Sequence, residues 1–323
     1  MAETQKRNIV FMGTPAFAAT VLRYLLREDN LAVAGVFTKP DSKTGRGMKT
    51  GISAVKELAL QYDLPLWQPK TLRSQEVEEI MRELKPDFII SASYGLILPQ
   101  NILDQARIAP LNVHASLLPK YRGAAPIQRA IMENWGPDAK TGVTIMKMEA
   151  GLDTGPVYSA LPVAIGRKNQ AEISAELAEK GGQLLVQTIQ KILNENLLPE
   201  KQVEQEATHA AMLVKEDGRI NWNLPTLQVD ALVRAVTPWP GATAIFEVNE
   251  EKTPVTILEC QPDFIDPCAQ PGTVRIKHGA LRAACSDGWL RIDKLKPQGR
   301  KAMLAADFIN GLRGAELKLA NYA

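Results

Sequence analysis

The stretch from Asn112 to Gln128 gathers several side chains that can do chemistry. Asn112, His114 and Ser116 supply an amide, an imidazole and a hydroxyl, in a chain that has only three histidines. Asn112 and His114 are two residues apart, so on a β-strand their side chains point to the same side. Gly123 and Pro126 then interrupt the backbone before a helical pattern. We therefore predict that Asn112 and His114 belong to one reaction centre at a strand end.

A carboxylate that can join these two groups is Asp153, which lies in a loop between Gly151 and Gly155. Taken singly, Asn112 and Asp153 are ordinary turn residues, and a histidine near a strand end is more often structural than catalytic. Together, an amide donor, an imidazole and a carboxylate are what acyl transfer needs. Asn112 and His114 can donate to an oxygen that gains negative charge. Asp153 can accept a proton through a water or keep His114 in its donating form.

The elements that must position these residues alternate between strand and helix. Buried strand patterns at 8–12, 31–38, 64–67, 86–95, 141–148 and 157–165 are separated by helical patterns at 15–27, 51–62, 75–84 and 127–132, and a long amphipathic helix follows at 169–193. This alternation predicts an α/β fold with a doubly wound, mostly parallel Rossmann-like sheet, whose ligands bind beyond the carboxyl ends of the strands. Thr14 suits an N-cap and Pro15 the first helical position. The G-x-G-x-x-G spacing of dinucleotide sites is missing.

The pattern changes in the last third of the chain. Residues 194–212 are polar, acidic and weakly periodic, which indicates a linker. From residue 213 on, short strand patterns are separated by turn pairs such as Pro240-Gly241 and Asp287-Gly288. We predict a first domain over 1–193, a linker over 194–212 and a smaller β-barrel or sandwich over 213–323.

Composition limits the class of protein. The chain has 323 residues, of which 45% are hydrophobic and 23% charged, and a net charge of +2. No segment is a basic tail, so any contact with RNA must come from local clusters. The three cysteines have no metal-ligand spacing and are odd in number, which favours a reducing compartment and disfavours zinc or a disulfide framework. The chain shows no signal segment and no long apolar run, so we expect a cytoplasmic protein without membrane contact.

Two basic clusters can meet phosphate. The first, at residues 39–49, includes Lys43, Arg46 and Lys49 together with two glycines. It is either a solvated flexible loop or a basic finger that touches RNA, since arginine offers a planar donor fork. The second cluster, at residues 291–301, contains five cationic residues and one acidic residue, and by itself it indicates a solvated strand edge.

The motifs resemble those of the 10-formyltetrahydrofolate-dependent formyltransferases. The resemblance rests on Asn112-x-His114-x-Ser116-Leu-Leu-Pro119, on Tyr121-Arg122-Gly123 with Pro126-Ile-Gln128, and on Asp153-Thr-Gly155. Further motifs are similar to the members of that family that act on methionyl-tRNA, and they span nearly the whole chain: Phe11-Met-Gly13-Thr14-Pro15, Lys39-Pro-Asp41 to Gly45-Arg46-Gly47, Arg234 with Pro238-Trp-Pro-Gly241, and Lys296-Pro-Gln-Gly299-Arg300-Lys301.

This resemblance implies that the chain transfers the formyl group of 10-formyltetrahydrofolate to the α-amino group of methionine on initiator methionyl-tRNA. The product would be formylmethionyl-tRNA for translation initiation. Asn112, His114 and Asp153 would be catalytic, no metal would take part, and we expect a monomer. The residues implied to shape the folate pocket are Ser116, Leu117, Leu118 and Pro119, with Tyr94, Gly95, Leu96 and Leu98.

The resemblance also assigns the basic clusters to tRNA. Arg46 would enter the acceptor stem, with Lys43 and Lys49 beside it on phosphate. The C-terminal domain would be an OB-like barrel that carries RNA on a basic face. Its candidate contacts are Lys296, Arg300 and Lys301. Arg122 stays open, because it can meet a carboxylate or a phosphate, or merely fasten its own loop.

Other functions remain open at this point. A purine-pathway glycinamide ribonucleotide formyltransferase would be expected to end near residue 193 and would not need the barrel. A formyltransferase acting on a sugar nucleotide, or a formyl-folate hydrolase, shares the folate chemistry, and a hydrolase has no use for the basic finger. A non-catalytic RNA-binding protein on an enzyme scaffold has no need of Asn112, His114 and Asp153 together.

Overall fold

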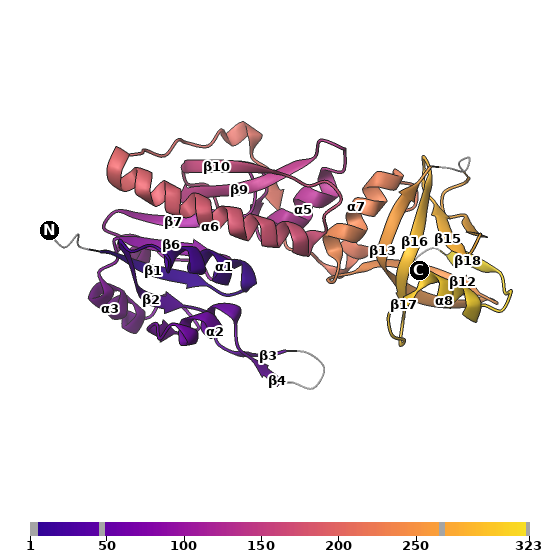
Figure 1. Cartoon of the computed structure of the whole chain (residues 1–323), viewed down its shortest axis with the longest axis horizontal. Coiled ribbons are helices and arrows are strands. Elements are labelled where there is room, and N and C mark those ends of the chain that lie inside the picture. The colour runs from indigo at the N-terminus through magenta and orange to yellow at the C-terminus, as the bar shows by residue number, and fades with distance from the viewer. Residues whose placement is uncertain (1–5, 45–48, 265–268, 321–323) are drawn as a thin grey trace. The chain divides into compact units, whose positions relative to one another are not determined.

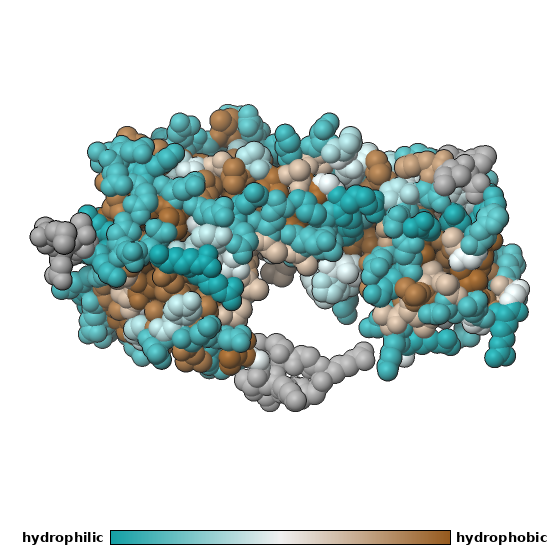
Figure 2. Space-filling model, in the orientation of Figure 1, coloured by the Kyte–Doolittle hydropathy of each residue, from teal (hydrophilic) through white to brown (hydrophobic). Residues whose placement is uncertain are grey.

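The computed structural model describes residues 6–44, 49–264 and 269–320, and the side chains of residues 42–50 are outside that description. The chain divides into two compact units, which are described separately. The first comprises Met1–Pro126, Thr141–Val163 and Ser174–Ala210, and the second comprises Ile127–Lys140, Ala164–Ile173 and Ala211–Ala323. Figure 2 shows a largely hydrophilic surface on both units in this view, with hydrophobic patches between polar residues.

The first unit is built on a seven-stranded sheet, which Figure 1 shows with helices packed along it. Its strand order is β10-β9-β7-β6-β1-β2-β5, and the five strands from β7 to β5 are parallel. The predicted α/β class and mostly parallel sheet are confirmed. The strands are β1 Arg7–Gly13, β2 Leu31–Phe37, β5 Leu66–Trp67, β6 Phe88–Ala92, β7 Ala109–His114, β9 Lys140–Lys147 and β10 Val157–Ala164.

Helix ends follow their capping residues. Ser53 and Ser74 each accept a backbone N–H through the side chain, so α2 begins at Ala54 and α3 at Gln75. Thr14 does not act as the predicted N-cap: Pro15 holds that position, and the Thr14 hydroxyl instead donates to the carbonyl of Tyr94 at 3.1 Å. The helices are α1 Ala16–Leu25, α2 Ala54–Gln61, α3 Gln75–Leu84, α4 Gln100–Leu103 and α6 Gln170–Glu195.

The segment after α6 lies along the first unit. Val157 and Glu200 form a β-bridge, a short 3₁₀ turn η1 spans Glu204–Glu206, and β11 (His209–Ala210) pairs in parallel with β8 (Arg122–Gly123). The part of the chain for which composition indicates a linker therefore contributes backbone pairing beside the candidate site.

The basic loop is a short hairpin at its base. Strands β3 (Ser42–Thr44) and β4 (Lys49–Gly51) pair antiparallel. Arg46 lies outside the described residues, and so do the side chains of Lys43 and Lys49. Their predicted contacts with RNA stay predictions.

The second unit contains the predicted β-barrel. Its antiparallel sheet has the order β14-β15-β16-β13-β12-β18, with β17 paired to β16, and curls into a nearly closed barrel. No helix in the described part of the chain has both the length and the apolar character needed to cross a membrane. The elements are α5 Pro126–Glu133, η2 Lys215–Gly218, α7 Thr226–Val236, β12 Ala242–Val248, β13 Glu251–Asp263, β14 Val274–Lys277, β15 Ala280–Ala284, β16 Trp289–Pro297, β17 Met303–Leu304, α8 Ala305–Gly311 and β18 Leu317–Ala320.

The Tyr94 hydroxyl and Thr141 Oγ1 are buried in the first unit and have no hydrogen-bond partner among the described residues. Tyr94 is 2% exposed and belongs to a cluster with Val10, Phe37 and Ile102, and its hydroxyl makes no hydrogen bond within the described residues. Burial raises the pKa of Tyr94 to about 12, because the charged phenolate would be desolvated there.

We expect Tyr94→Phe to leave the free energy of unfolding unchanged or to raise it by about 1 kcal/mol, since the change removes an unsatisfied hydroxyl and keeps the ring. Urea unfolding monitored by circular dichroism measures this. A loss of more than about 1 kcal/mol would show that the hydroxyl has a partner.

Candidate active site

The carboxylate of Asp153 is the centre of the candidate site. Its Oδ1 accepts a hydrogen bond from Asn112 Nδ2 at 3.4 Å and lies 3.6 Å from His114 Nδ1. Its Oδ2 accepts from the backbone N–H of Gly123 at 2.8 Å. The structure thus brings together all three residues that the sequence predicts to be catalytic. Their catalytic roles remain predictions.

Strand register sets the position of Asn112 and His114 at the end of β7. Asn112 is aligned with Ser91 of β6 on one side and with Met146 of β9 on the other. His114 is buried, and its Nε2 lies 3.0 Å from the carbonyl oxygen of Tyr121. A carbonyl can only accept, so Nε2 carries a proton and Nδ1 is the nitrogen that faces Asp153.

The loop that carries Asp153 folds back on β7. Because β9 runs antiparallel to β7, it ends beside Leu111 rather than beyond His114. The chain reverses at once, and Lys147 N donates to the carbonyl of Pro156 at 2.8 Å. A side chain at Gly155 would collide with the Lys147 carbonyl, so glycine is needed where the two arms of the loop approach. Asp153 itself has a left-handed φ of 53°.

A cavity of about 260 Å³ opens beside Asn112 and Asp153. Its walls are mostly apolar, and its polar side chains include Ser91, Asn112 and Asp153, which suits a flat heterocycle with a polar edge. Of the predicted folate residues, Leu96 and Leu98 line it. The remaining lining residues are Ile97, Leu103, Met146, Met148, Glu149, Ala150, Gly151 and Leu152.

The other predicted folate residues lie elsewhere. Ser116 Oγ donates to the carbonyl of Lys120 at 2.6 Å, and Leu118 N donates to Thr144 Oγ1 at 3.2 Å. These contacts fix the turn through Leu117 and Pro119, whose peptide with Leu118 is cis. Tyr94 is buried in the core and Gly95 lies against the ammonium of Lys39. None of these six residues lines the cavity, and their role towards folate stays a prediction.

Sequence reasoning missed the cavity residues on β6 and β9. Ser91 and Met146 flank Asn112 across three neighbouring strands and face the same space. Only their position in the sheet identifies them. Once β6, β7 and β9 are known to be adjacent, the residues in register with Asn112 are candidates for lining the site. Ile97 and Leu152 are also missed, although they are 76% and 67% exposed at this cavity. Exposed apolar side chains at a cavity favour a ligand with an apolar surface.

The basic residues predicted in the second unit are exposed. Lys296 is the last residue but one of β16, and Arg300 and Lys301 follow the end of this strand. None of the three makes an ion pair within the described residues. The neighbouring cations on β16 do form ion pairs: Arg291 pairs with Asp293, and Lys294 pairs with Glu259. The available positive charge of this cluster is therefore concentrated at residues 296–301.

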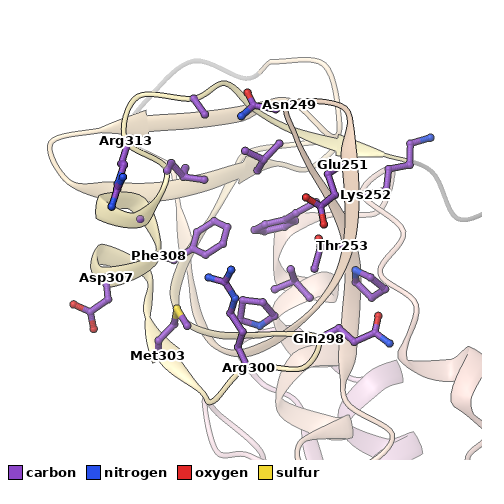
Figure 3. Close-up of a pocket in the computed structure, with 18 of the residues that line it drawn as sticks. Asn249, Glu251, Lys252, Thr253, Gln298, Arg300, Met303, Asp307, Phe308 and Arg313 are labelled. Atoms are coloured by element: carbon purple, nitrogen blue, oxygen red, sulfur yellow. The ribbon is translucent and has the colours of Figure 1, made fainter.

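The barrel unit has a larger cavity, of about 1100 Å³, next to this turn. Figure 3 shows the side chains of Arg300 and Phe308 projecting into it. The ring of Phe308 lies 5.7 Å from that of Phe246, measured between centroids. Apolar and cationic side chains thus share one concave surface. Its charged lining residues are Lys252, Arg300 and Arg313 against Glu251 and Asp307.

Comparison with known proteins gives full-length matches. The family model described as "Formyl transferase" matches residues 6–189, and the one described as "Formyl transferase, C-terminal domain" matches residues 212–313. A methionyl-tRNA formyltransferase of Desulfovibrio desulfuricans is 41% identical over 319 residues, which cover 96% of this chain and 94% of the relative. One from Nitratidesulfovibrio vulgaris is 42% identical over 314 residues, covering 95% and 94%.

Solved structures share the fold at lower identity. HypX from Aquifex aeolicus superposes with a TM-score of 0.62 at 18% identity, over 96% of this chain and 50% of that one, so the chain spans half of HypX. An N-formyltransferase from Helicobacter canadensis, solved with folinic acid and dTDP-3-aminofucose, gives a TM-score of 0.66 at 19% identity, over 89% and 98%. At such identities the likeness concerns the fold alone.

We expect neutral His114 to be the tautomer protonated on Nε2, because the Tyr121 carbonyl accepts there. Nitrogen-15 spectra of histidine-labelled protein, recorded above the pH at which the ring loses its charge, measure this directly. His114→Gln identifies the His114 signals among those of the three histidines. A proton on Nδ1 in the neutral ring would contradict this geometry.

Proposed function

This chain belongs to the formyl transferase family, and we propose that it transfers the formyl group of 10-formyltetrahydrofolate to the α-amino group of methionine on initiator methionyl-tRNA. The product is formylmethionyl-tRNA for translation initiation. The observation that carries this proposal is the Asp153 carboxylate between Asn112 and His114, at a cavity that suits a flat heterocycle. We expect a monomeric, cytoplasmic enzyme.

The cavity beside Asn112 fits the folate donor. Leu98, Leu103 and Met146 can cover the faces of a pterin, while Ser91 and the loop at 149–152 offer polar groups at its edge. Proteins of the same fold bind related molecules: HypX was solved with tetrahydrofolic acid and the Helicobacter enzyme with folinic acid. The donor supplies an acyl carbon that an amine can attack.

The residues of this chain handle charge and protons. As the amine attacks, negative charge gathers on the formyl oxygen, and the amide N–H of Asn112 can donate to it. Asp153 accepts the proton that leaves the amine, directly or through a water. His114 Nδ1 lies 3.6 Å from the same carboxylate oxygen, so the ring can take that proton from Asp153 and hold it until it is passed on. The proton finally reaches the folate nitrogen that loses the formyl group.

The nucleophile needs little activation. Free α-amino groups titrate near about 7.7 to 8.0, so at neutral pH a useful fraction is already uncharged. The site therefore lowers the barrier mainly by orienting the reactants and by stabilising the developing charge. A fixed donor such as Asn112 and a fixed carboxylate such as Asp153 suffice for this, and no strong base is needed.

The test is a direct assay. The protein is incubated with 10-formyltetrahydrofolate and methionine-charged initiator tRNA, and N-formylmethionine is sought after the ester is hydrolysed. Glycinamide ribonucleotide, an amino-sugar nucleotide and water serve as rival acceptors in parallel. Formylation of a rival acceptor without formylation of methionyl-tRNA would overturn the proposal.

We expect Asn112→Ala to lower kcat by roughly 10²- to 10³-fold, as loss of one donor to a developing oxyanion does, while the KM for tRNA stays nearly constant. Steady-state kinetics on charged initiator tRNA measure both. Asn101→Ala, an exposed asparagine of α4 that donates to Glu78, is the matched control and should behave as the parent chain does. A raised KM with unchanged kcat would instead place Asn112 in binding.

The barrel unit supplies a surface for RNA. Arg300 and Phe308 face the same cavity, which offers a cation for phosphate and a ring on which a base can stack. Lys296 and Lys301 add positive charge beside it. Arg46, Lys43 and Lys49 of the basic loop are the proposed contacts from the first unit.

Arg300→Ala should raise the KM for tRNA roughly threefold to tenfold with kcat unchanged, because a phosphate contact stabilises ground state and transition state alike. It should also reduce the slope of binding against salt by about 1. Filter binding at several salt concentrations tests this. Arg82→Ala on α3, which also removes an exposed arginine, is the control. An unchanged salt slope would remove Arg300 from the interface.

A further inference from the structure

Arg122 is a buried cation that makes four side-chain hydrogen bonds. Its side chain is 2% exposed, and Nη1 and Nη2 donate to the two carboxylate oxygens of Glu204, each at 2.9 Å. Nε and Nη2 also donate to Oε1 of Gln202, at 3.1 and 3.0 Å. The hydrogen bond from Arg122 lowers the pKa of Glu204. Arg122 is therefore not available to a folate carboxylate or to phosphate.

Gln202 extends this network to the catalytic loop. Its Nε2 donates to the carbonyl of Asp153 at 2.8 Å and to that of Gly155 at 2.7 Å. The amide cannot be turned round, because its oxygen must face the guanidinium and its nitrogen the two carbonyls. One side chain thus fixes two backbone groups of the loop on either side of Thr154.

The side chain of Asp153 is fixed to the same strand. Its Oδ2 accepts the N–H of Gly123, the residue after Arg122, and both belong to β8. Asp153 is therefore held to β8 in two ways. Its backbone carbonyl is linked to Arg122 of β8 through Gln202, and its carboxylate accepts directly from Gly123 of β8. The left-handed φ of 53° at Asp153 is rare for a residue with a side chain and persists where the surroundings enforce it.

We propose that Gln202 is a positioning residue of the reaction, which holds the Asp153 carboxylate against Asn112 and His114, and that Arg122 and Glu204 orient the Gln202 amide. The inference rests on the proposed function, because that function defines the reaction. The hydrogen-bond network itself does not depend on it. A small displacement of the carboxylate is costly, because a misplacement of about 1 Å can reduce a rate ~10²-fold.

The decisive variant is Gln202→Glu. A carboxylate can still accept from Arg122, so the buried cation keeps its partners, but it cannot donate to the carbonyls of Asp153 and Gly155. We expect kcat for formylation to fall about 10²-fold while the KM for tRNA and for the folate stay within about twofold. Gln183→Glu on α6, whose Nε2 donates to the Tyr24 hydroxyl at 3.2 Å, is the matched control and should leave kcat unchanged.

Amide hydrogen exchange tests the same network and does not depend on an activity assay. In Gln202→Glu the Gly123 N–H should exchange faster, because its acceptor Asp153 Oδ2 is no longer held, while Gln183→Glu should not affect it. If the parent chain fails to formylate methionyl-tRNA, the proposed function fails and this exchange still decides the network. Unchanged kcat together with unchanged exchange at Gly123 would overturn the inference.

Glu204→Ala provides a second route should Gln202→Glu not fold. The Glu204 side chain is 74% exposed, so its removal leaves packing intact, and Arg122 keeps Gln202. We expect a smaller fall in kcat, of roughly twofold to tenfold, with KM unchanged, since the amide of Gln202 is less firmly oriented. A rise in KM with constant kcat would show that this cluster serves binding and would equally overturn the inference.

Discussion

A largely buried carboxylate is the constraint on which the candidate site depends. The Asp153 side chain is 12% exposed, and a carboxylate removed from water is costly unless donors surround it. Asn112 and Gly123 supply two such donors, and His114 Nδ1 lies nearby. Because these groups come from β7 and β8, the carboxylate is stable only when both strands are in place. The site and the fold are therefore formed together.

Strand direction explains how these pieces meet. In a purely parallel sheet, the loop after β9 would leave at the same edge as the loop after β7. Since β9 is antiparallel, it ends beside Leu111 in the middle of β7, and the following loop has to turn back to bring Asp153 to Asn112. The return leaves space between the loop and the strand ends, and that space is the cavity lined by Ser91, Asn112 and Met146.

The sequence predicts the regular elements well where local signals are strong. The helix at 75–84 has its expected bounds, because Ser74 caps its start and Lys85 adopts a left-handed conformation at its end. The helix predicted from residue 51 begins instead at Ala54, since Ser53 is the cap. The convergence of Asn112, His114 and Asp153 was also predictable, from residue types and motif. The helix bounds are encoded within a few residues, whereas the convergence joins two short motifs that are 41 residues apart.

What the sequence does not predict is encoded by pairing over long distances. Gln202 contacts Arg122, which is 80 residues away, and nothing in a polar stretch distinguishes a glutamine that pairs from one that is solvated. The same limit applies to Ser116–Pro119, where the motif is evident but the hydrogen bonds of its turn go to Lys120 in the loop and to Thr144 on β9. A sequence motif indicates that its residues act together, but only the folded structure shows which of them face the cavity.

The division between facing and supporting residues has a consequence for specificity. Asn112 and Asp153 line the cavity, whereas His114 and Arg122 are buried behind them, so few side chains at the candidate site are free to recognise an acceptor. Acyl transfer chemistry of this kind does not distinguish one amine from another. Discrimination among acceptors must then come from groups outside the candidate site, and Arg300 and the ring of Phe308, which line the barrel cavity, are groups of the kind that RNA recognition uses.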